Sequence, residues 1–384
     1  MENFVYYNPV KIFFGKGEID KLGEILKSYG FKKILFTYGC GSIKKNGIYD
    51  RVIKQLKNFD FIEFGGIQPN PLYEHLIKGI EIVKTEGIDF ILAVGGGSVI
   101  DGSKFIAAGA CIDKDPWEIL TGEVAVERAI PLGDILTLPA TGTEMNGNAV
   151  ISKETTKEKL AFGSPHVMPV FSILDPEACY SLPDIQISNG IVDAFVHVME
   201  QYLTYPVNAY IQDGYSETIL KTLIDIGPKV LKDKKNYEYM ANFMWSTTMA
   251  LNGLICTGVP EDWSTHNIGH EITALCGIDH GQTLAIVLPG VMSVMRNDKK
   301  EKLLQYGKNV WGLINPKEEN IDLIIELTET FFRSLGIKTR LSEYNIDKSV
   351  IDKIVKRFEQ RNQLLGEREN ITPPIIKRIL ESRF

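Results

Sequence analysis

The sequence is poor in cysteine. It has five cysteines in 384 residues, an odd number, and no C-x-x-C pair occurs. A disulfide scaffold is therefore not expected, and free thiols predict a reducing compartment, the cytoplasm. The N-terminus has no basic segment followed by an apolar core, so no signal peptide is predicted. No apolar run approaches the length that a bilayer requires, so no membrane partner is expected.

An excess of basic charge is also missing. The formal net charge is −7, which argues against a nucleic-acid partner, because such a partner requires a basic face. The lysine-rich stretch 297–304 is typical of a solvent-exposed helix start. The hydrophobic fraction of 44% and the charged fraction of 24% are ordinary for a globular protein, and 384 residues predict two domains.

Short apolar runs alternate with helical periodicity in the first half of the chain. The runs cover residues 32–39, 59–67, 89–97, 134–143 and 169–176. Between several of them lie segments such as 71–87, in which apolar residues recur at helical spacing. This alternation predicts a parallel sheet covered by helices on both faces, with ligands bound outside the carboxyl ends of the strands.

The pattern changes after about residue 182, where strand-like runs become rare. Long segments of helical periodicity take over, at 184–204, 208–232, 237–256, 262–276, 283–296, 319–335 and 349–363. The sequence therefore predicts an α/β domain over residues 1–182 and an all-α domain over residues 183–384.

A glycine-rich loop follows the third apolar run and begins a helix. Gly95, Gly96 and Gly97 allow the backbone to approach a ligand, and Ser98 adds a hydroxyl to the free N–H groups of the helix start. These features predict a cradle for a pyrophosphate. The spacing is not G-x-G-x-x-G, because Ile100 occupies the third glycine position, and an ordinary turn is the alternative.

Two further loops follow predicted strands. The loop 138–146 contains Thr141 and is either part of the same crevice or an ordinary turn. After the first strand there is no carboxylate to bond a ribose 2′-OH, and Gly39, Gly41 and Ser42 lie there beside lysines. This composition suits a 2′-phosphate and favours NADP(H), with NAD(H) as the alternative. A glycine turn before a solvated helix would explain the same residues.

Histidine is scarce but clustered. The chain has six histidines, and His266, His270 and His280 lie within one short stretch. His266 and His270 are four residues apart and share a helix face, as do Asp193 and His197 in an apolar run. Imidazoles with one carboxylate suit Fe²⁺, Zn²⁺ or Co²⁺. The alternative is a set of hydrogen-bonded core residues, but a buried carboxylate is rarely left without a partner.

These motifs together resemble those of a known enzyme family. The stretches are GGGSVIDGSKFIAA (95–108), LPATGTEMN (138–146), IVDAFVHVMEQY (191–202) and DWSTHNIGHEITALCGIDHGQTLAIVLP (262–289). They are similar to the iron-containing (group III) alcohol dehydrogenases, in the branch of butanol dehydrogenases and NADPH-dependent aldehyde reductases. The resemblance covers nearly the whole chain. It implies the architecture shared with dehydroquinate synthase, in which a Rossmann-like dinucleotide-binding domain precedes an all-helical metal-binding domain.

The resemblance also implies the residues of the site. The metal ligands would be Asp193, His197, His266 and His280, and His270 would lie near the metal as a catalytic proton relay. The expected cofactor-binding residues are Gly39, Gly41, Ser42, Asn70, Gly95, Gly96, Gly97, Ser98, Asp101, Thr137, Thr141 and Lys159. The absence of an acidic residue near Cys40 again favours NADP(H).

The implied reaction is hydride transfer between a nicotinamide and a short-chain aldehyde or primary alcohol. One divalent metal, Fe²⁺ first and Zn²⁺ or Co²⁺ as alternatives, would polarise the substrate oxygen, and a homodimer is expected. Two other classes of function stay open. A dehydroquinate-synthase-like lyase would need several basic residues for an anionic substrate, and the helical motifs offer few. A non-catalytic protein that binds metal or nucleotide would keep the loops without turnover.

Overall fold

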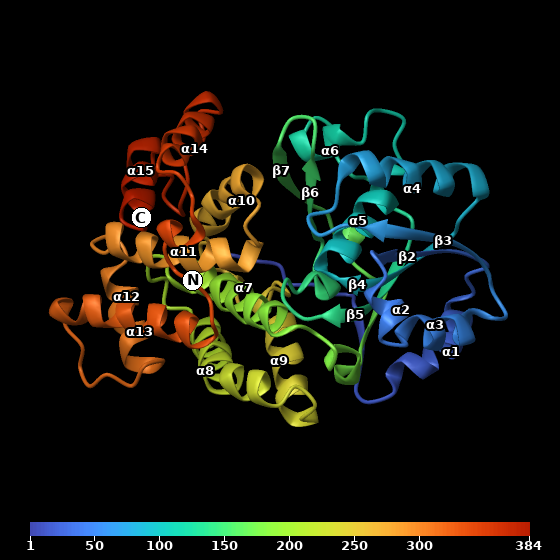
Figure 1. The fold of residues 1–384 in the computed structure, drawn as a ribbon, viewed down its shortest axis with the longest axis horizontal. Helices are drawn as coiled ribbons and strands as arrows, with labels where there is room; N and C mark the ends of the chain where they lie inside the picture. The colour runs from blue at the N-terminus through green and yellow to red at the C-terminus, as the bar shows by residue number, and fades with distance from the viewer. The chain divides into compact units, whose positions relative to one another are not determined.

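The computed structural model describes all 384 residues and divides the chain into two compact units. The sheet unit contains Tyr7–Leu182 and Lys234–Met244. The helical unit contains Met1–Tyr6, Pro183–Asp233 and Trp245–Phe384. Figure 1 shows the strands gathered in the first unit and the long helices in the second.

The sheet unit is built on six parallel strands. Their spatial order is β1 (Lys11–Phe14), β8 (Phe171–Leu174), β5 (Leu132–Leu138), β4 (Phe90–Gly96), β2 (Lys33–Gly39) and β3 (Asp60–Ile67). The central strands are apolar on both faces, and residues 90–94 of β4 are fully buried. The expected parallel sheet is thus confirmed.

Helices cover both faces of this sheet (Figure 1). They are α1 (Leu22–Tyr29), α2 (Ser42–Lys45), α3 (Ile48–Leu56), α4 (Tyr73–Glu86) and α5 (Gly97–Gly109). A short helix, α6 (Trp117–Thr121), instead contacts strand β7 (Glu158–Gly163). Apolar residues of α1 and α3 pack against Phe36 of β2 and Phe90 of β4. On the other face, Ser103 of α5 lies 2.7 Å from the Thr37 hydroxyl of β2. Successive residues of β2 therefore contact helices on opposite faces of the sheet.

The strand order creates a switch point between β2 and β4. The chain leaves β2 toward β3 on one side and leaves β4 toward β5 on the other. Ligands of open α/β sheets bind outside the carboxyl ends of strands at such a point. The loop at 39–42 and the glycine loop at 95–98 follow these two strands.

A two-stranded antiparallel hairpin was not expected from the sequence. It consists of β6 (Asn148–Lys153) and β7 (Glu158–Gly163), and β6 contacts α5. Most of its residues are polar or partly exposed, so it lacks the apolar run that marks the buried strands. The hairpin brings Lys159 within hydrogen-bond distance of the Asn70 side chain, as described below.

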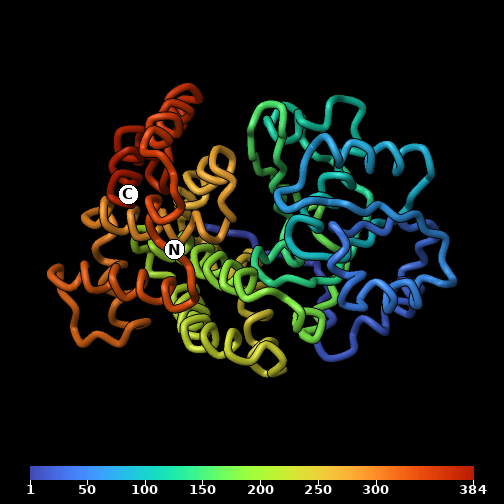
Figure 2. The backbone as a smooth tube through the Cα atoms, in the orientation of Figure 1, coloured from blue at the N-terminus to red at the C-terminus, as the bar shows by residue number.

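The helical unit contains long helices around a buried one. They are α7 (Asp184–Tyr202), α8 (Tyr210–Lys232), α10 (Ser264–Cys276), α11 (His280–Val294), α12 (Lys300–Asn309), α13 (Ile321–Ser334), α14 (Ser349–Gln360) and α15 (Pro373–Glu381). Helix α9 (Tyr237–Ala250) begins in residues of the sheet unit and ends in residues of the helical unit. Residues 190–202 of α7 are all buried, and α7 packs against α8 and α11 (Figure 2). No helix is both long and apolar enough to cross a membrane.

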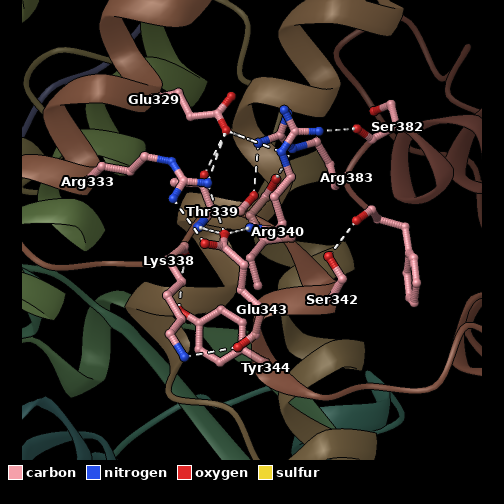
Figure 3. Close-up of polar contacts among 12 residues, drawn as sticks. Glu329, Arg333, Lys338, Thr339, Arg340, Ser342, Glu343, Tyr344, Ser382 and Arg383 are labelled. Atoms are coloured by element: carbon pink, nitrogen blue, oxygen red, sulfur yellow. Dashed lines mark hydrogen bonds and ion pairs between the residues drawn. The ribbon is translucent and has the colours of Figure 1, made fainter.

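A buried arginine ties three parts of the helical unit together (Figure 3). Arg383 donates from Nε to the Ile286 carbonyl of α11 at 2.9 Å and from Nη2 to the Thr339 carbonyl at 2.8 Å. It also pairs with Glu329 of α13 at 2.8 Å. A Cβ at Gly290 would lie 2.8 Å from the Arg383 Cγ, so a residue without a side chain is needed where α11 meets the arginine.

Loss of this arginine should destabilise the helical unit. We expect Arg383→Met to lower the free energy of unfolding by about 3 kcal/mol or more, because the Ile286 and Thr339 carbonyls would lose their buried donor and Glu329 would lose its closest cation, at 2.8 Å. Urea denaturation followed by circular dichroism measures this. Lys377→Met is the control, since Lys377 pairs with Asp352 at 2.7 Å but both side chains are largely exposed, and its loss should cost less than about 1 kcal/mol. Equal effects of the two substitutions would contradict a special stabilising role for Arg383.

Candidate metal centre and dinucleotide loops

Helix α7 presents Asp193 and His197 on one face. The two residues are four apart and each is only 4% exposed. The Asp193 Oδ1 atom lies 3.6 Å from the His197 Nε2 atom. The helical spacing expected from the sequence therefore brings a carboxylate and an imidazole together inside the helical unit.

Two other helices supply histidines to the same oxygen. His266 of α10 and His280, the first residue of α11, each place Nε2 3.6 Å from Asp193 Oδ1. The rings of His197 and His266 stack with centroids 4.5 Å apart. The ligand atoms of Asp193, His266 and His280 all lie within 4.8 Å of one another. Three helices thus converge on one carboxylate oxygen.

This donor set fits a divalent metal ion. Four ligands at about 2.1 Å from a common ion lie about 3.4 Å apart when they are tetrahedral, which is close to the 3.6 Å between Asp193 Oδ1 and each of the three Nε2 atoms. The Nε2 atom of His266 is buried and has no hydrogen-bond partner in the protein. Three imidazoles with one carboxylate suit Fe²⁺, Zn²⁺ or Co²⁺ better than Ca²⁺ or Mg²⁺.

Close helix packing explains how the four side chains meet. A Cβ at Gly281, beside His280, would lie 2.5 Å from the Asn189 carbonyl oxygen of α7. A Cβ at Gly269 of α10 would lie 2.9 Å from the Thr283 hydroxyl of α11. Glycine at these two positions lets α11 approach both α7 and α10.

Burial and charge act in opposite directions on two of the histidines. Burial lowers the pKa of His197 to about 4, which favours the neutral ring that a metal requires. Burial also disfavours the charged form of His266, but Glu200 and Asp193 outweigh this and raise the pKa of His266 to about 9. A bound cation and a proton therefore compete at His266.

Glu200 is a residue of this site that the sequence analysis missed. It lies three residues after His197, is 2% exposed, and its Oε2 atom contacts the His266 Nδ1 atom. Its Oε1 atom accepts hydrogen bonds from the amides of Thr265 and His266. A signal was present, because a glutamate in an otherwise apolar buried run needs a partner just as Asp193 does.

His270 and Trp263 lie beside the cluster. The His270 ring centroid is 5.0 Å from that of His280 and 6.3 Å from that of His266, and His270 is only partly buried. This placement, near the donor atoms but outside them, agrees with the expectation, and its catalytic role stays a prediction. The Trp263 indole contacts His266 and His197 edge-on, at centroid distances of 5.4 and 6.2 Å.

The glycine loop of the sheet unit contacts several of the expected cofactor residues. A Cβ at Gly97 would lie 2.7 Å from the Thr141 hydroxyl, so the two loops touch where only glycine fits. The Ser98 hydroxyl accepts a hydrogen bond from the Asn70 amide at 3.2 Å. Lys159 donates to the Asn70 side chain at 2.9 Å. Four loop and hairpin segments thus meet at the carboxyl end of β4.

The remaining expected cofactor positions lie at neighbouring strand ends. Gly39 ends β2, Gly41 has a φ of 108° that favours glycine, and Ser42 begins α2. Thr137 is buried near the end of β5. Gly95 and Gly96 end β4. Their contact with a cofactor stays a prediction.

Asp101 has its carboxylate occupied by the protein itself. Its Oδ1 atom accepts the Thr143 hydroxyl at 2.7 Å and its Oδ2 atom accepts the Val150 amide at 2.9 Å. The residue is 8% exposed. These contacts favour a role in holding the second loop over direct contact with a cofactor.

Lys104 is the second residue that the sequence analysis missed. It is fully buried in α5, three residues after Asp101, and its Nζ atom donates within 2.9 Å to oxygens of Thr143, Asn146 and Asn148. Burial lowers the pKa of Lys104 to about 8, although three acidic residues raise it: Asp101, Asp134 and Glu144. The helix that begins at the glycine loop therefore also anchors the second loop.

Family models match the chain in two consecutive parts. The model described as iron-containing alcohol dehydrogenase matches residues 9–176. The model described as the C-terminal part of the Fe-containing alcohol dehydrogenase family matches residues 187–384.

Individual proteins match over the whole length. The NADPH-dependent aldehyde reductase YqhD of Escherichia coli is 51% identical over 100% of both chains. NADH-dependent butanol dehydrogenase A of Clostridium acetobutylicum is 42% identical over 93% of each chain. A crystal structure of Escherichia coli YqhD superposes with a TM-score of 0.97 at 50% identity, covering 100% of this chain and 99% of that one.

Removal of the Lys104 anchor should weaken dinucleotide binding. We expect Lys104→Met to raise the dissociation constant for NADPH by about tenfold, because a charge-assisted hydrogen bond contributes about 1.5–3 kcal/mol. In the unsubstituted protein the ammonium form holds the loop below about pH 8. NADPH binding should therefore weaken as the pH rises through the folded-state pKa of about 8, and this dependence should be absent in the variant.

Fluorescence titration with NADPH between about pH 7 and pH 9.5 measures both effects. Lys84→Met is the matched control, since Lys84 donates to a single carbonyl, that of Ile112, on the exposed face of α4. Equal NADPH affinities of the two variants at pH 7 would contradict the role of Lys104 in holding the loop for dinucleotide binding.

Proposed function

Because the chain belongs to the iron-containing alcohol dehydrogenase family, we propose that it is a metal-dependent, NAD(P)H-linked alcohol dehydrogenase and aldehyde reductase. It interconverts short-chain aldehydes, such as butanal, with primary alcohols by hydride transfer. The curated relatives named as an aldehyde reductase and a butanol dehydrogenase support this assignment.

One observation carries the proposal. Three imidazole Nε2 atoms from three helices each lie 3.6 Å from the same buried carboxylate oxygen. In a set of hydrogen-bonded core residues an Nε2–H would donate to the carboxylate at about 3.2 Å or less, whereas a shared cation explains the common 3.6 Å spacing.

Asp193, His197, His266 and His280 would hold the ion. A bound divalent ion acts as a Lewis acid on a carbonyl or alcohol oxygen, and the nicotinamide provides the hydride chemistry. We assign Fe²⁺ first, in keeping with the family, and Zn²⁺ or Co²⁺ as alternatives that suit the same donors.

His270 is the candidate for proton transfer. An imidazole can release or accept a proton near neutral pH. The ring lies beside that of His280 and is partly exposed, so it can exchange protons between the site and solvent.

We assign NADP(H) as the preferred cofactor. The segment 39–45, after β2, has no carboxylate to bond a ribose 2′-OH, and Ser42 with two lysines suits a 2′-phosphate. The relatives carry both preferences, since the aldehyde reductase is named NADPH-dependent and the butanol dehydrogenase NADH-dependent. A cytoplasmic location stays a prediction from the cysteine usage.

A homodimer is our proposal for the assembly. Strand β1 lies at the edge of the sheet and pairs only with β8, and Tyr7 just before it is 76% exposed. An open strand edge with apolar neighbours is suited to pairing with a second copy. Sedimentation equilibrium should give twice the monomer mass, and a monomer at all concentrations would contradict this proposal.

The function is tested by loading the metal-depleted protein with Fe²⁺ or Zn²⁺ without oxygen and following NADPH and NADH oxidation with butanal. We expect metal-dependent turnover with NADPH preferred. His266→Ala should lower the rate by about a hundredfold or more while NADPH still binds, because it removes a ligand and leaves the sheet unit unchanged.

His166→Ala is the control, since this exposed histidine lies outside the cluster. An unchanged rate in His266→Ala would contradict the metal role. Metal binding without turnover on any aldehyde would instead favour a lyase or a non-catalytic binding protein.

A further inference from the structure

We propose that Glu200 is a positioning residue that fixes the ring and the tautomer of His266 for metal binding. The inference rests on the metal role proposed above for His266. It assigns Glu200 a task distinct from those of the four ligands, since Glu200 contacts a ligand and not the ion.

The carboxylate of Glu200 replaces a missing helix cap. The first N–H groups of a helix have no partner within the helix. Trp263 precedes α10 with a φ of 59° and offers no side-chain cap. Glu200 Oε1, from α7, accepts the amide of Thr265 at 2.5 Å and that of His266 at 3.3 Å. The start of α10 is therefore fixed to α7 at the residue that carries the imidazole.

The second oxygen of Glu200 determines the hydrogen position on His266. Because Oε2 contacts Nδ1, the ring donates its Nδ1–H to Glu200. When the ring is neutral, as metal binding requires, its single N–H is the one on Nδ1, so Nε2 offers its lone pair. That Nε2 atom points toward Asp193 Oδ1, 3.6 Å away, where a metal would be bound.

His197 shows by contrast what this contact contributes. Its Nδ1 atom is buried and has no hydrogen-bond partner, so no protein acceptor determines its tautomer. The protein thus orients His266 through a carboxylate but leaves His197 without one. His266 should therefore contribute the larger share of metal affinity.

Buried ionic contacts hold the segment before α10 without any metal. The Asp262 amide donates to the Glu200 carbonyl at 2.9 Å, and Asp262 Oδ1 accepts the Ser264 amide at 2.9 Å. Asp262 also pairs with Lys299 at 2.7 Å, and Lys299 pairs with Glu367 at 2.9 Å. Lys299 is 2% exposed, so the expectation that the stretch 297–304 is solvent-exposed was wrong at this lysine. These contacts fix the chain on both sides of the cap, so the orientation of His266 precedes metal binding.

Two substitutions of Glu200 separate its capping of α10 from its control of the His266 tautomer. Glu200→Gln keeps one carbonyl oxygen to accept the two amides, but its NH₂ group cannot accept the Nδ1–H of His266. Glu200→Ala removes both functions. Competition with a chelator, using Zn²⁺ and Co²⁺, measures the dissociation constant of each variant, and metal-free thermal unfolding measures the fold.

We expect Glu200→Gln to weaken Zn²⁺ binding by about tenfold to a hundredfold, with Glu200→Ala at least as weak. Glu217→Gln is the matched control, since Glu217 is a buried carboxylate of the helical unit that accepts the Tyr202 hydroxyl at 2.8 Å and touches no histidine. If Glu200→Gln binds Zn²⁺ as tightly as Glu217→Gln does, Glu200 is only a cap and the proposal is wrong.

Nuclear magnetic resonance of the Zn²⁺-loaded, unsubstituted protein gives a test that needs no folded variant. The His266 Nδ1 proton should resonate far downfield and exchange slowly with solvent, because the Glu200 carboxylate accepts it in a charge-assisted hydrogen bond. An Nδ1 proton with the shift and fast exchange of an unbonded imidazole would overturn the proposal. Failure of the metal role itself has a different signature, because His266→Ala would then retain the Zn²⁺ affinity of the unsubstituted protein.

Discussion

A carboxylate buried among three imidazoles is the constraint on which the helical unit depends. Asp193 lies in the middle of α7, where all neighbouring residues are buried. A charge in such a place costs several kcal/mol unless a partner compensates it. The glycines at 269 and 281 and the carboxylate of Glu200 keep three helices where their histidines surround this oxygen. The helix packing therefore places the metal-ligand atoms around one point. A divalent cation bound there would offset the free-energy cost of burying the Asp193 charge.

The sheet unit is organised around a buried charge of the opposite sign. Lys104 is fully buried in α5, and its ammonium group collects oxygens from the loop that follows β5. The same helix begins at the glycine loop, where Gly97 touches Thr141. Helix α5 thus carries the glycine loop at its start and, about two turns later, the lysine that anchors the other loop. The two loops cannot shift independently, which gives the expected dinucleotide site a fixed shape.

The sequence predicted most elements because their signals are local. Apolar runs marked the buried strands, and helical periodicity marked the long helices to within about three residues, except that the predicted helix 237–256 was too long, since α9 ends at Ala250. The predicted strand 134–143 was too long, since β5 ends at Leu138 and the polar loop follows. The hairpin at 148–163 lacked an apolar run and was missed. Glu200 and Lys104 were missed because their partners lie far away in sequence, and spacing alone does not show such contacts. Likewise, only the structure shows that three Nε2 atoms lie at the same distance, 3.6 Å, from Asp193 Oδ1.

Trp263, whose backbone has a left-handed conformation with a φ of 59°, gives the helical unit an optical property that depends on the metal site. Its indole contacts the rings of His197 and His266, while its backbone is held in a conformation that few bulky residues adopt. The excited state of an indole so close to the donor atoms is sensitive to what those atoms hold. A paramagnetic ion such as Fe²⁺ or Co²⁺ quenches nearby emission, whereas Zn²⁺ does not. The chain has four tryptophans, and the emission of this one would report which metal ion the proposed site binds.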